Sequence, residues 1–547
     1  MIYERIPHRF SPPSGGVLVW LCVVSVFIGY SGIVLAAATE TATPPAKREA
    51  SVYIREYRVL GSKLIQPLEV EKAVYPFLGP ERTPQDVDQA RAALEKVYHD
   101  KGYQSVAVEV PQQNGRGGIV YLKVVEATVG RLRVRDARFF LPSDIKSKAP
   151  SLAEGKVPNF NEVTKDIIAL NTADRRVTPK VNPGVEPGTV DVDLIVKDTF
   201  PMHGSLELNN RYSQDTVPLR LNGSFSYGNL WQLEHSAGVS FQIAPERPSD
   251  AQVYTGYYLM PVPGVDGLAL MFSGTHQGSD VSTLGGAAVA GRGNILSLRA
   301  VISLAPHGSF YQSLSVGMDY KHFDENVVIG TDTTSTPVDY YPFAFNYGAS
   351  YTGSKSFTEF NGSVNFAFRG LGSQPDKFDN KRYLADGAYI YVRGDLSHTQ
   401  DLPGGFQAYA KLQGQLSDSP LINSEQYAGG GLNTVRGYLE STALGDSGGF
   451  GTFELRSPSF FGRPKDKTTP VNNEWRVYGF FDGGHLMLNE PLPEQKDQYD
   501  LASFGVGSRM KLFGHLNASA DAGWPLVTQG STLAHDVFVT FRVWADF

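Results

Sequence analysis

Apolar and polar residues alternate with a period of two along most of the chain after Met202. Between Leu219 and Tyr227 every second residue is apolar or glycine, and the residues between them are polar: Arg220, Asn222, Ser224 and Ser226. The last segment, 537–547, alternates in the same way and ends in Phe547. A two-residue period predicts β-strands with one apolar and one polar face. Membrane barrels with a wet lumen and soluble sandwiches both alternate, so this pattern alone leaves both open.

Sixteen such segments can be counted, which predicts an all-β transmembrane barrel of 16 antiparallel strands over residues 199–547. Bacterial outer-membrane barrels have an even number of strands, and sixteen leave room for a channel. The segments begin near His203, Val217, Glu234, Gln252, Gly267, Gly293, Phe310, Asp339, Phe357, Arg382, Gly405, Phe450, Trp475, Asp500, His515 and Asp536.

Residues 51–198 mix strand and helix patterns, and one order of elements occurs twice. The first copy, 51–127, includes a helix that Thr83 and Pro84 open as N-cap and first helical residue. The second copy, 128–198, repeats the order β-α-α-β-β, which predicts two small α+β domains whose three-stranded sheets keep an exposed edge. The expected elements are 52–60, 67–77, 83–102, 105–110 and 119–125 in the first copy, and 129–137, 142–148, 159–171, 175–181 and 189–196 in the second.

The first fifty residues are typical of an exported protein. Arg5 and Arg9 precede an apolar run, 17–35, which ends in three alanines. This pattern predicts a signal peptide over 1–38 with cleavage near Ala38, followed by a polar linker, 39–50. An uncleaved membrane anchor is the alternative, because about 20 apolar residues can span a bilayer. The single cysteine, Cys22, lies in this segment, so no disulfide is expected in the mature chain.

Composition narrows the function further. The formal net charge is -7, and the chain has no long basic run, so nucleic-acid binding is not expected. Glycine (57) and aromatic residues (12%) are plentiful, as in barrels with aromatic girdles. The sequence lacks H-E-x-x-H, G-x-S-x-G and phosphate-loop motifs, so we expect no catalytic residue, no metal and no cofactor.

The longest connection between predicted strands, 418–449, contains a glycine-rich stretch with one cation, Arg436. Long loops without secondary structure tend to be functional. On the thirteenth predicted strand, Asp482 shares the polar face with Arg476 and Tyr478, and a buried carboxylate in that position favours a cationic partner. We therefore expect the loop to fold into the lumen and to bring Arg436 to Asp482.

Two motifs in this region resemble those of the BamA-like superfamily. They are V-R-G-Y on the loop and F-x-D-x-G on the strand, made up of Val435, Arg436, Gly437 and Tyr438, and of Phe480, Asp482 and Gly484. The order of elements in 51–198, with Tyr98, Gly102-Tyr103 and Val124-Val125-Glu126, resembles POTRA domains. Two POTRA-like units before a sixteen-stranded barrel are similar to the two-partner secretion branch, the FhaC/ShlB/HecB-type haemolysin secretion/activation transporters (TpsB).

This resemblance implies a location in the bacterial outer membrane, with the POTRA domains in the periplasm. It implies a secreted exoprotein, a β-helical adhesin or cytolysin, as client that binds by strand addition and leaves through the barrel. It further implies contact with outer-membrane lipid, assembly by the outer-membrane barrel-assembly machinery, and a monomeric chain. Arg436 and Asp482 would then lock the loop in the lumen, supported by Val435, Gly437, Tyr438, Phe480 and Gly484.

Two departures from the family pattern stand out. Ala127 occupies a turn where the family usually has glycine, and the dozen residues after Ala38 are too few for the plug helix and linker of many members. Two other functions are alternatives. A BamA/TamA-like assembly factor shares the loop motif but usually carries more POTRA units, and a small-solute porin predicts neither the repeats nor the loop.

Overall fold

The computed structural model describes residues 51–547, apart from 114–115, 279–280, 283–288, 291, 325, 330–331, 336 and 462–471. The expected signal peptide (1–38) and linker (39–50) lie outside the described residues. The described chain divides into two compact units, with the boundary between Pro201 and Met202. Among the described helices, none is both long enough and apolar enough to cross a membrane.

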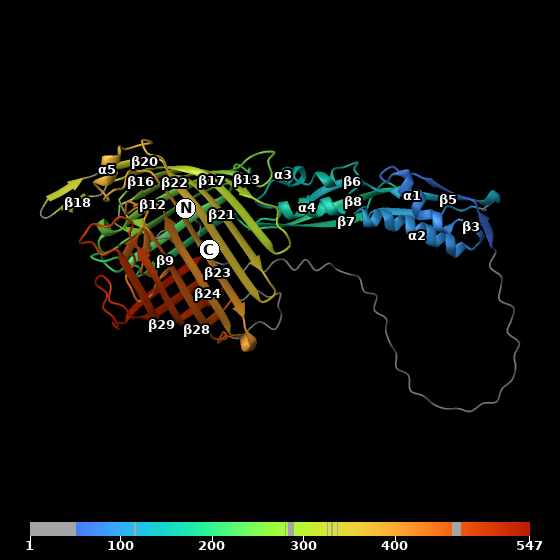
Figure 1. Ribbon diagram of the computed structural model, residues 1–547. Helices are drawn as coiled ribbons and strands as arrows, with labels where there is room; N and C mark the ends of the chain where they lie inside the picture. Colours follow the sequence, from blue (N-terminus) through green and yellow to red (C-terminus); the bar gives the residue numbers. More distant parts are fainter. Residues whose placement is uncertain are drawn as a thin grey trace, which may run out of the picture. The chain divides into compact units, whose positions relative to one another are not determined.

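The first unit contains two α+β domains (Figure 1). The first domain has a three-stranded sheet in the order β2-β5-β4. β2 runs parallel to β5 and β4 runs antiparallel to it, while β1 pairs with β3. Leu94 and Tyr98 of the long helix α2 are fully buried in the core with Leu122 of β5. The elements are β1 (Val52–Ile54), β2 (Glu56–Leu60), α1 (Pro67–Val74), η1 (Tyr75–Phe77), β3 (Gly79–Arg82), α2 (Pro84–Asp100), β4 (Val106–Glu109), η2 (Arg116–Gly118) and β5 (Ile119–Glu126).

Local sequence signals explain the ends of α2. Thr83 forms a capping box with Asp86: the Asp86 backbone N–H donates to the Thr83 hydroxyl, and the Thr83 backbone N–H donates to the Asp86 carboxylate at 2.8 Å. Gly102 follows the helix with φ +94°, a conformation that glycine adopts without strain. These residues thus fix the helix that carries Tyr98 into the core.

A buried tyrosine joins the helix to the end of the sheet. The Tyr98 hydroxyl lies 2.6 Å from the Ser62 hydroxyl and donates to Glu126 at 3.1 Å. Burial raises the pKa of Tyr98 to about 12, so it remains a donor at neutral pH. Glu126 also accepts the backbone N–H groups of Lys63 and Leu64. Ala127, which follows, is not among the described residues with positive φ, so this turn accepts alanine in place of glycine.

The second domain repeats this arrangement with the sheet order β6-β8-β7. β6 is parallel to β8 and β7 is antiparallel to it, and the predicted order β-α-α-β-β holds here. In the first domain the short strand β3, which was not predicted, lies between α1 and α2. Its core includes Ile145, Leu170 and Leu194, all fully buried. The elements are β6 (Thr128–Arg135), α3 (Pro142–Ser147), η3 (Pro150–Leu152), α4 (Phe160–Leu170), β7 (Arg175–Pro183) and β8 (Thr189–Asp198).

The second unit is a closed antiparallel barrel of 16 strands within the described residues, as predicted (Figure 1). β20 and β21 both pair with β17 and form one strand interrupted at Tyr341-Pro342. The strands are β9 (Met202–Asn209), β10 (Arg220–Leu230), β11 (His235–Ile243), β12 (Gln252–Pro261), β13 (Leu268–Gln277), β16 (Gly293–Ser303), β17 (Phe310–Phe323), β20 (Val338–Tyr340) with β21 (Phe343–Thr352), β22 (Ser356–Ala367), β23 (Tyr389–Asp401), β24 (Gln407–Ser417), β27 (Ser447–Arg456), β28 (Glu474–Met487), β29 (Gln498–Leu512), β30 (Leu516–Pro525) and β31 (Phe538–Asp546).

Short elements occupy the connections between barrel strands. β25 pairs with β26 inside the connection from β24 to β27, and α5 precedes β23. The remaining short pairs are β14 with β15 and β18 with β19. These elements are η4 (Pro248–Asp250), β14 (Val281–Ser282), β15 (Val289–Ala290), β18 (Asn326–Ile329), β19 (Asp332–Ser335), α5 (Pro375–Asp379), η5 (Pro403–Gly405), β25 (Tyr427–Gly429) and β26 (Ala443–Gly445).

The two faces of the barrel wall differ as the alternation predicts. Apolar side chains on the outer face are largely exposed in the isolated chain, for example Val239, Leu412, Phe481 and Val506. Charged side chains of β27, β28 and β30 lie on the inner face, where Asp482 is opposite Thr452 and Ser503. Lipid therefore meets the apolar face, and the lumen is polar.

Two predicted boundaries were wrong. β23 begins at Tyr389 rather than near Arg382, because residues 375–379 form α5 and Arg382 lies in the connection before the strand. The connection after β24 ends at Asp446 rather than at Gly449, because β27 already pairs with β24 from Gly448 onward. The other predicted strands begin within three residues of the observed starts.

Candidate functional site in the barrel lumen

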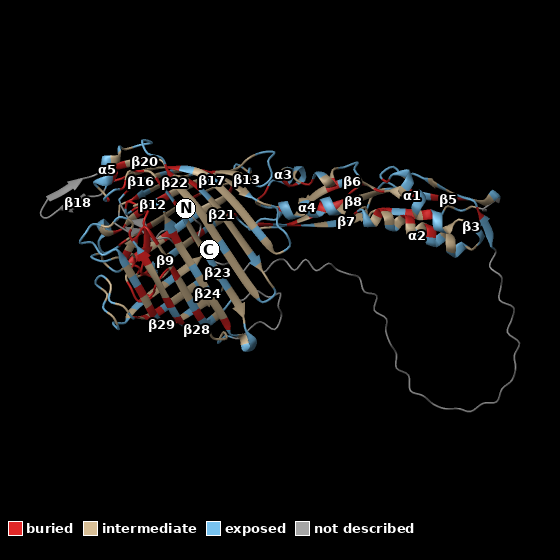
Figure 2. Ribbon diagram, viewed as in Figure 1, coloured by how far each residue is buried: buried red, intermediate tan, exposed pale blue. Residues whose placement is uncertain are grey.

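Residues 418–446, here called the luminal loop, connect β24 to β27 and fold into the barrel. Most residues from 421 to 440 are buried, and buried residues gather inside the cylinder (Figure 2). Three glycines take positive φ angles: Gly430 (+100°), Gly431 (+96°) and Gly437 (+90°). A Cβ at Gly431 would overlap the Glu440 carboxylate, so this turn is tight as well as left-handed. The glycine run therefore lets the loop fold back before it presents Arg436.

Arg436 binds Asp482 through two parallel hydrogen bonds. Nε of Arg436 is 2.7 Å from one carboxylate oxygen, and an NH2 group is 2.8 Å from the other. The backbone N–H of Arg436 also donates to Asp482 at 3.1 Å. The two residues are 3% and 1% exposed, so water screens this ion pair little. A bidentate arginine–carboxylate pair is among the stronger and more directional polar contacts in proteins.

Two further carboxylates reach the same guanidinium. NH1 of Arg436 is 2.7 Å from Glu454 on β27 and 3.3 Å from Asp521 on β30. Asp521 also accepts the Tyr478 hydroxyl at 2.6 Å. The loop cation is thus held by three strands of the wall rather than by β28 alone.

Arginines of the wall balance the excess of negative charge. Glu454 is 2.6 Å from Arg456 and 3.0 Å from Arg509. The set of Arg436, Asp482, Glu454, Asp521, Arg456 and Arg509, here called the Arg436 cluster, contains three carboxylates and three guanidinium groups. Because removal of one partner leaves a buried charge uncompensated, such a set constrains the loop strongly.

Aromatic rings complete the environment of Arg436. The Phe480 ring lies under the guanidinium at 3.6 Å from its centroid, and the Tyr478 ring lies at 6.0 Å. On the loop, the Tyr438 hydroxyl bonds the backbone carbonyls of Val527 at 2.7 Å and Ala502 at 3.1 Å. Val435 is fully buried in a cluster with Tyr438. The motif residues around Arg436 thus fix the tip by packing and hydrogen bonding.

Two glycines on the wall allow close contact. A Cβ at Gly523 on β30 would lie 2.7 Å from the backbone nitrogen of Gly437, so the loop and the strand touch backbone to backbone. A Cβ at Gly484 would overlap the Phe450 ring, which packs in the same apolar cluster as Val435. Glycine at these positions brings the loop tip within reach of the charged wall.

The structure brings together the residues that the sequence singled out. Arg436 and Asp482 form the expected ion pair, and Val435, Gly437, Tyr438, Phe480 and Gly484 surround it or support its neighbours. Sequence reasoning missed Glu454, Arg509 and Gly523. It gave Asp521 and Arg456 no role either. The alternation along each strand assigns these residues to the face that lines the lumen. It does not show which residue each of them contacts.

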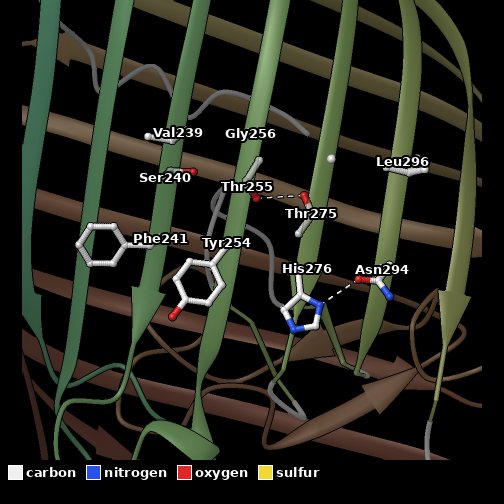
Figure 3. Close-up of a pocket in the computed structure, with 11 residues that line it drawn as sticks. Val239, Ser240, Phe241, Tyr254, Thr255, Gly256, Thr275, His276, Asn294 and Leu296 are labelled. Atoms are coloured by element: carbon white, nitrogen blue, oxygen red, sulfur yellow. Dashed lines mark hydrogen bonds between the residues drawn. The ribbon is translucent and has the colours of Figure 1, made fainter.

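A second concave region lies on the other face of the wall. A groove of about 520 Å³ crosses β11, β12, β13 and β16, and Phe241, Tyr254 and Leu296 are among its lining residues (Figure 3). These three side chains belong to the outward, apolar set, whereas Thr255 and Thr275 bond each other at 2.9 Å on the inner face. In the described part of the chain no group of histidine, cysteine, aspartate or glutamate is arranged to hold a metal ion.

The fold and the site define a class: an outer-membrane barrel of the BamA-like type, with a loop in its lumen and α+β domains before it. The sequence profile of the haemolysin secretion/activation protein ShlB/FhaC/HecB matches residues 188–510, and that of the ShlB-type POTRA domain matches 52–127. The first match covers more than half of the chain. The chain therefore belongs to the ShlB/FhaC/HecB family, whose members are outer-membrane transporters rather than enzymes.

Individual proteins agree with this assignment. The outer membrane transporter CdiB of Dickeya dadantii is 22% identical over 528 residues, covering 90% of this chain and 86% of that protein. CdiB of Escherichia coli O6:K15:H31 is 24% identical over 523 residues, covering 89% and 81%.

Among solved structures, CdiB from Escherichia coli has a TM-score of 0.62 at 20% identity and covers 93% of both chains. BamA from Haemophilus ducreyi lacking POTRA domains 1-3 has a TM-score of 0.55 at 14% identity, covering 91% of this chain and 100% of that one. These structural likenesses show the shared fold. The chain resides in the outer membrane with its POTRA domains in the periplasm.

Proposed function

We propose that the chain exports a secreted partner protein by two-partner secretion. The partner, a β-helical adhesin or cytolysin, reaches the periplasm unfolded and adds an extended segment to the edge of a POTRA sheet. It then threads the barrel past the luminal loop and folds outside the cell. Membership of the transporter family supports a role in transport. The identity of the client is itself part of the proposal.

The observation that carries the proposal is the way the luminal loop is held. The loop passes into the lumen, and its tip is fixed by the side chains of the Arg436 cluster and by Tyr438. A loop held in this way can leave the lumen and return while the barrel stays closed. We propose that the Arg436–Asp482 pair is the lock that keeps the loop inside between export events.

The sheet edges of the first POTRA domain are suited to binding the client. β2 and β4 are the outer strands of the order β2-β5-β4. In the second domain, the outer strand β7 contains Pro179 and Pro183, which have no N–H group to donate to an added strand. Both outer strands of the first domain are free of proline, whereas in the second domain only β6 is free of proline, so we assign recognition to the first domain.

The lock is tested by replacing Arg436 or Asp482 with alanine in the full chain and measuring the partner secreted into the medium. We expect export to fall sharply while the barrel still assembles, as judged by its heat-modifiable mobility in electrophoresis. Lys411→Ala, which removes another cation from the lumen-facing side of β24, is the control. Unchanged export in either variant of the pair would remove the lock from the mechanism.

Deletion of 51–125 tests the recognition step. We expect it to abolish export of the partner and to leave pore conductance in planar bilayers intact. If the chain were instead an assembly factor, deletion of 51–125 would lower the abundance of other outer-membrane barrels. Unchanged barrel abundance together with lost export favours the transporter.

A further inference from the structure

A carboxylate of the luminal loop, Glu425, lies in a site separate from the Arg436 cluster, whose carboxylates all belong to the wall. Glu425 is 2% exposed, and its backbone N–H donates to Ile422 at 2.8 Å in a tight turn. Lys321 of β17 is 2.6 Å from one carboxylate oxygen of Glu425. Burial of this kind requires compensation, because an unpaired carboxylate in a dry site is strongly unfavourable.

Two tyrosines of the wall supply the rest of that compensation. The Tyr340 hydroxyl of β20 donates to the same oxygen as Lys321 at 2.6 Å, and the Tyr391 hydroxyl of β23 donates to the other oxygen at 2.8 Å. Glu425, Lys321, Tyr340 and Tyr391 are here called the Glu425 cluster. The carboxylate therefore has one cation and two hydroxyl donors, and both of its oxygens are bonded.

The Glu425 cluster lies in apolar surroundings. Tyr340 and Tyr391 belong to a buried group that brings loop residues against the wall. Its other members are Phe323, Val338, Ala367, Phe378, Ala385, Tyr389, Leu421 and Ile422. A hydrogen-bonded charge in such a group is electrostatically stronger than it would be in water.

The two clusters lie at different depths of the barrel. Lys321 is near the end of β17, whereas Tyr340 and Tyr391 are near the starts of their strands, which is the end of the barrel where the luminal loop leaves β24. Asp482 is near the middle of β28, and Glu454 is near the far end of β27. The Glu425 cluster therefore holds the loop at its mouth and the Arg436 cluster holds it deeper in the lumen, while Glu440 with Arg211 and Asp446 with Arg382 form further ion pairs of the loop.

We propose that Glu425 is a second positioning residue for the luminal loop. It fastens the outer half of the loop to the β17–β23 side of the wall, independently of Arg436, and both clusters must release before the loop clears the lumen. The lysine makes a single point-charge contact, whereas Arg436 makes a bidentate one, so the Glu425 cluster is the easier of the two to open. The export measurement depends on the proposed export function. The hydrogen-exchange and channel-opening measurements do not.

Further contacts place the neighbouring loop residues on the same side of the wall. The backbone carbonyl of Glu425 accepts from Gln415 at 3.2 Å. Tyr427 lies over the Arg393 guanidinium at 5.3 Å, and Tyr391 lies at 5.5 Å from it. When the charge of Glu425 is removed, these contacts with Gln415 and Arg393 still hold the neighbouring loop residues near the wall.

The test uses Glu425→Gln and Lys321→Met in the full chain, with Lys411→Met as the matched luminal control. The readouts are hydrogen exchange of 418–446 and the open fraction of single channels in planar bilayers. Loss of a charge-assisted hydrogen bond is expected to raise exchange and opening by about tenfold in both variants. The control should match the unaltered chain.

Three further variants separate positioning from simple loss of folding. The charge swap Glu425→Lys with Lys321→Glu should restore part of the closed fraction. Tyr340→Phe with Tyr391→Phe should give a smaller rise than Glu425→Gln. Glu425→Gln added to Arg436→Ala should raise exchange beyond either change alone, because the clusters are independent.

Several results would overturn the proposal. They are unchanged exchange in Glu425→Gln, equal effects of Lys411→Met and Lys321→Met, or no additional effect of Glu425→Gln in the Arg436→Ala background. Increased exchange and opening with unchanged export would support the second anchor and count against the proposed export route. The two failures are therefore distinguishable.

Discussion

Two arcs of the same barrel wall differ sharply in charge. β11, β12 and β13 contain no aspartate, glutamate, lysine or arginine, and their inner faces carry small hydroxyl side chains such as Ser240, Thr255 and Thr275. β27 to β30 carry Glu454, Asp482, Arg509 and Asp521, all within the Arg436 cluster. Both arcs belong to one closed sheet with the same alternation.

The comparison shows what the luminal charges are for. Hydroxyl side chains are adequate for a wall that faces water, since each can bond solvent or a neighbour. Where the loop displaces water, each charge needs a partner of opposite sign, and the wall supplies a balanced set. The charged arc is thus a docking surface for the loop, and the variants below test that difference.

The largest effect is expected from Arg436→Ala, which leaves Asp482, Glu454 and Asp521 without the loop cation. Removing one partner of a buried pair is strongly destabilising, by roughly 3–5 kcal/mol. Hydrogen exchange of 418–446 in detergent should show that loss in the free energy of loop opening. Arg542→Ala, at the more exposed pair with Glu207 on β9, should lose less free energy of loop opening, because neither residue belongs to the loop or to the Arg436 cluster. Equal losses would show that the Arg436 cluster holds the loop no more firmly than an ion pair elsewhere on the wall does.

Gly523→Ala should have the next largest effect. Its Cβ would lie 2.7 Å from the Gly437 nitrogen, and overpacking of this kind is destabilising by about 1–3 kcal/mol. Gly256→Ala is the matched control on β12, because a Cβ there meets nothing within 4 Å. The midpoint of heat-modifiable unfolding should fall for the first variant and stay level for the second. A shared shift would show that both strands merely tolerate alanine poorly.

Tyr438→Phe removes a hydroxyl that bonds the backbone carbonyls of Ala502 on β29 and of Val527 just after β30, while it keeps the ring. We expect a loss of about 1 kcal/mol in the free energy of loop opening, the usual net contribution of a hydrogen bond. Exchange rates of the amides around 438 measure this directly. Rates as high as those of Arg436→Ala would mean that the hydroxyl, not the ion pair, holds the tip.

The smallest effect is expected in the uncharged arc. Thr255→Val removes the 2.9 Å bond with Thr275 and should change the unfolding free energy by about 0.5–1 kcal/mol. Because this site is away from the loop contacts described above, exchange of 418–446 should not change. Denaturant unfolding of the folded barrel in detergent provides the first measurement, and faster loop exchange would contradict the prediction.

Sequence alone reached the fold and the centre of the site because both depend on local periodicity. A period of two assigns Asp482 to the inner face without knowledge of its neighbours, and V-R-G-Y indicates which loop residue lies nearby. Strand pairing is different, because Glu454, Asp482 and Asp521 meet only through the register of three strands. That the Arg436–Asp482 pair acts as a lock during export stays a prediction.

Residues in irregular connections were beyond this reasoning. Glu425 belongs to no periodic segment, so nothing in the sequence linked it to Lys321, 104 positions earlier. The predicted start of a strand near Arg382 was wrong for a related reason: Arg382 lies in an irregular connection, where its guanidinium is 3.3 Å from Asp446. Charges that serve long-range contacts look like ordinary polar residues in the sequence.

The direct pairing of β24 with β27 has a mechanical consequence. Gln415 lies opposite Gly448, and Gln407 lies opposite Arg456. The loop therefore starts and ends on two strands that are hydrogen-bonded to each other. The loop can therefore move out of the lumen and back while both of its ends stay fixed in the sheet. No hydrogen bond between barrel strands has to break when the loop moves. The resistance to passage therefore comes from the contacts between the loop and the wall, and the side chains that make these contacts can be replaced one at a time.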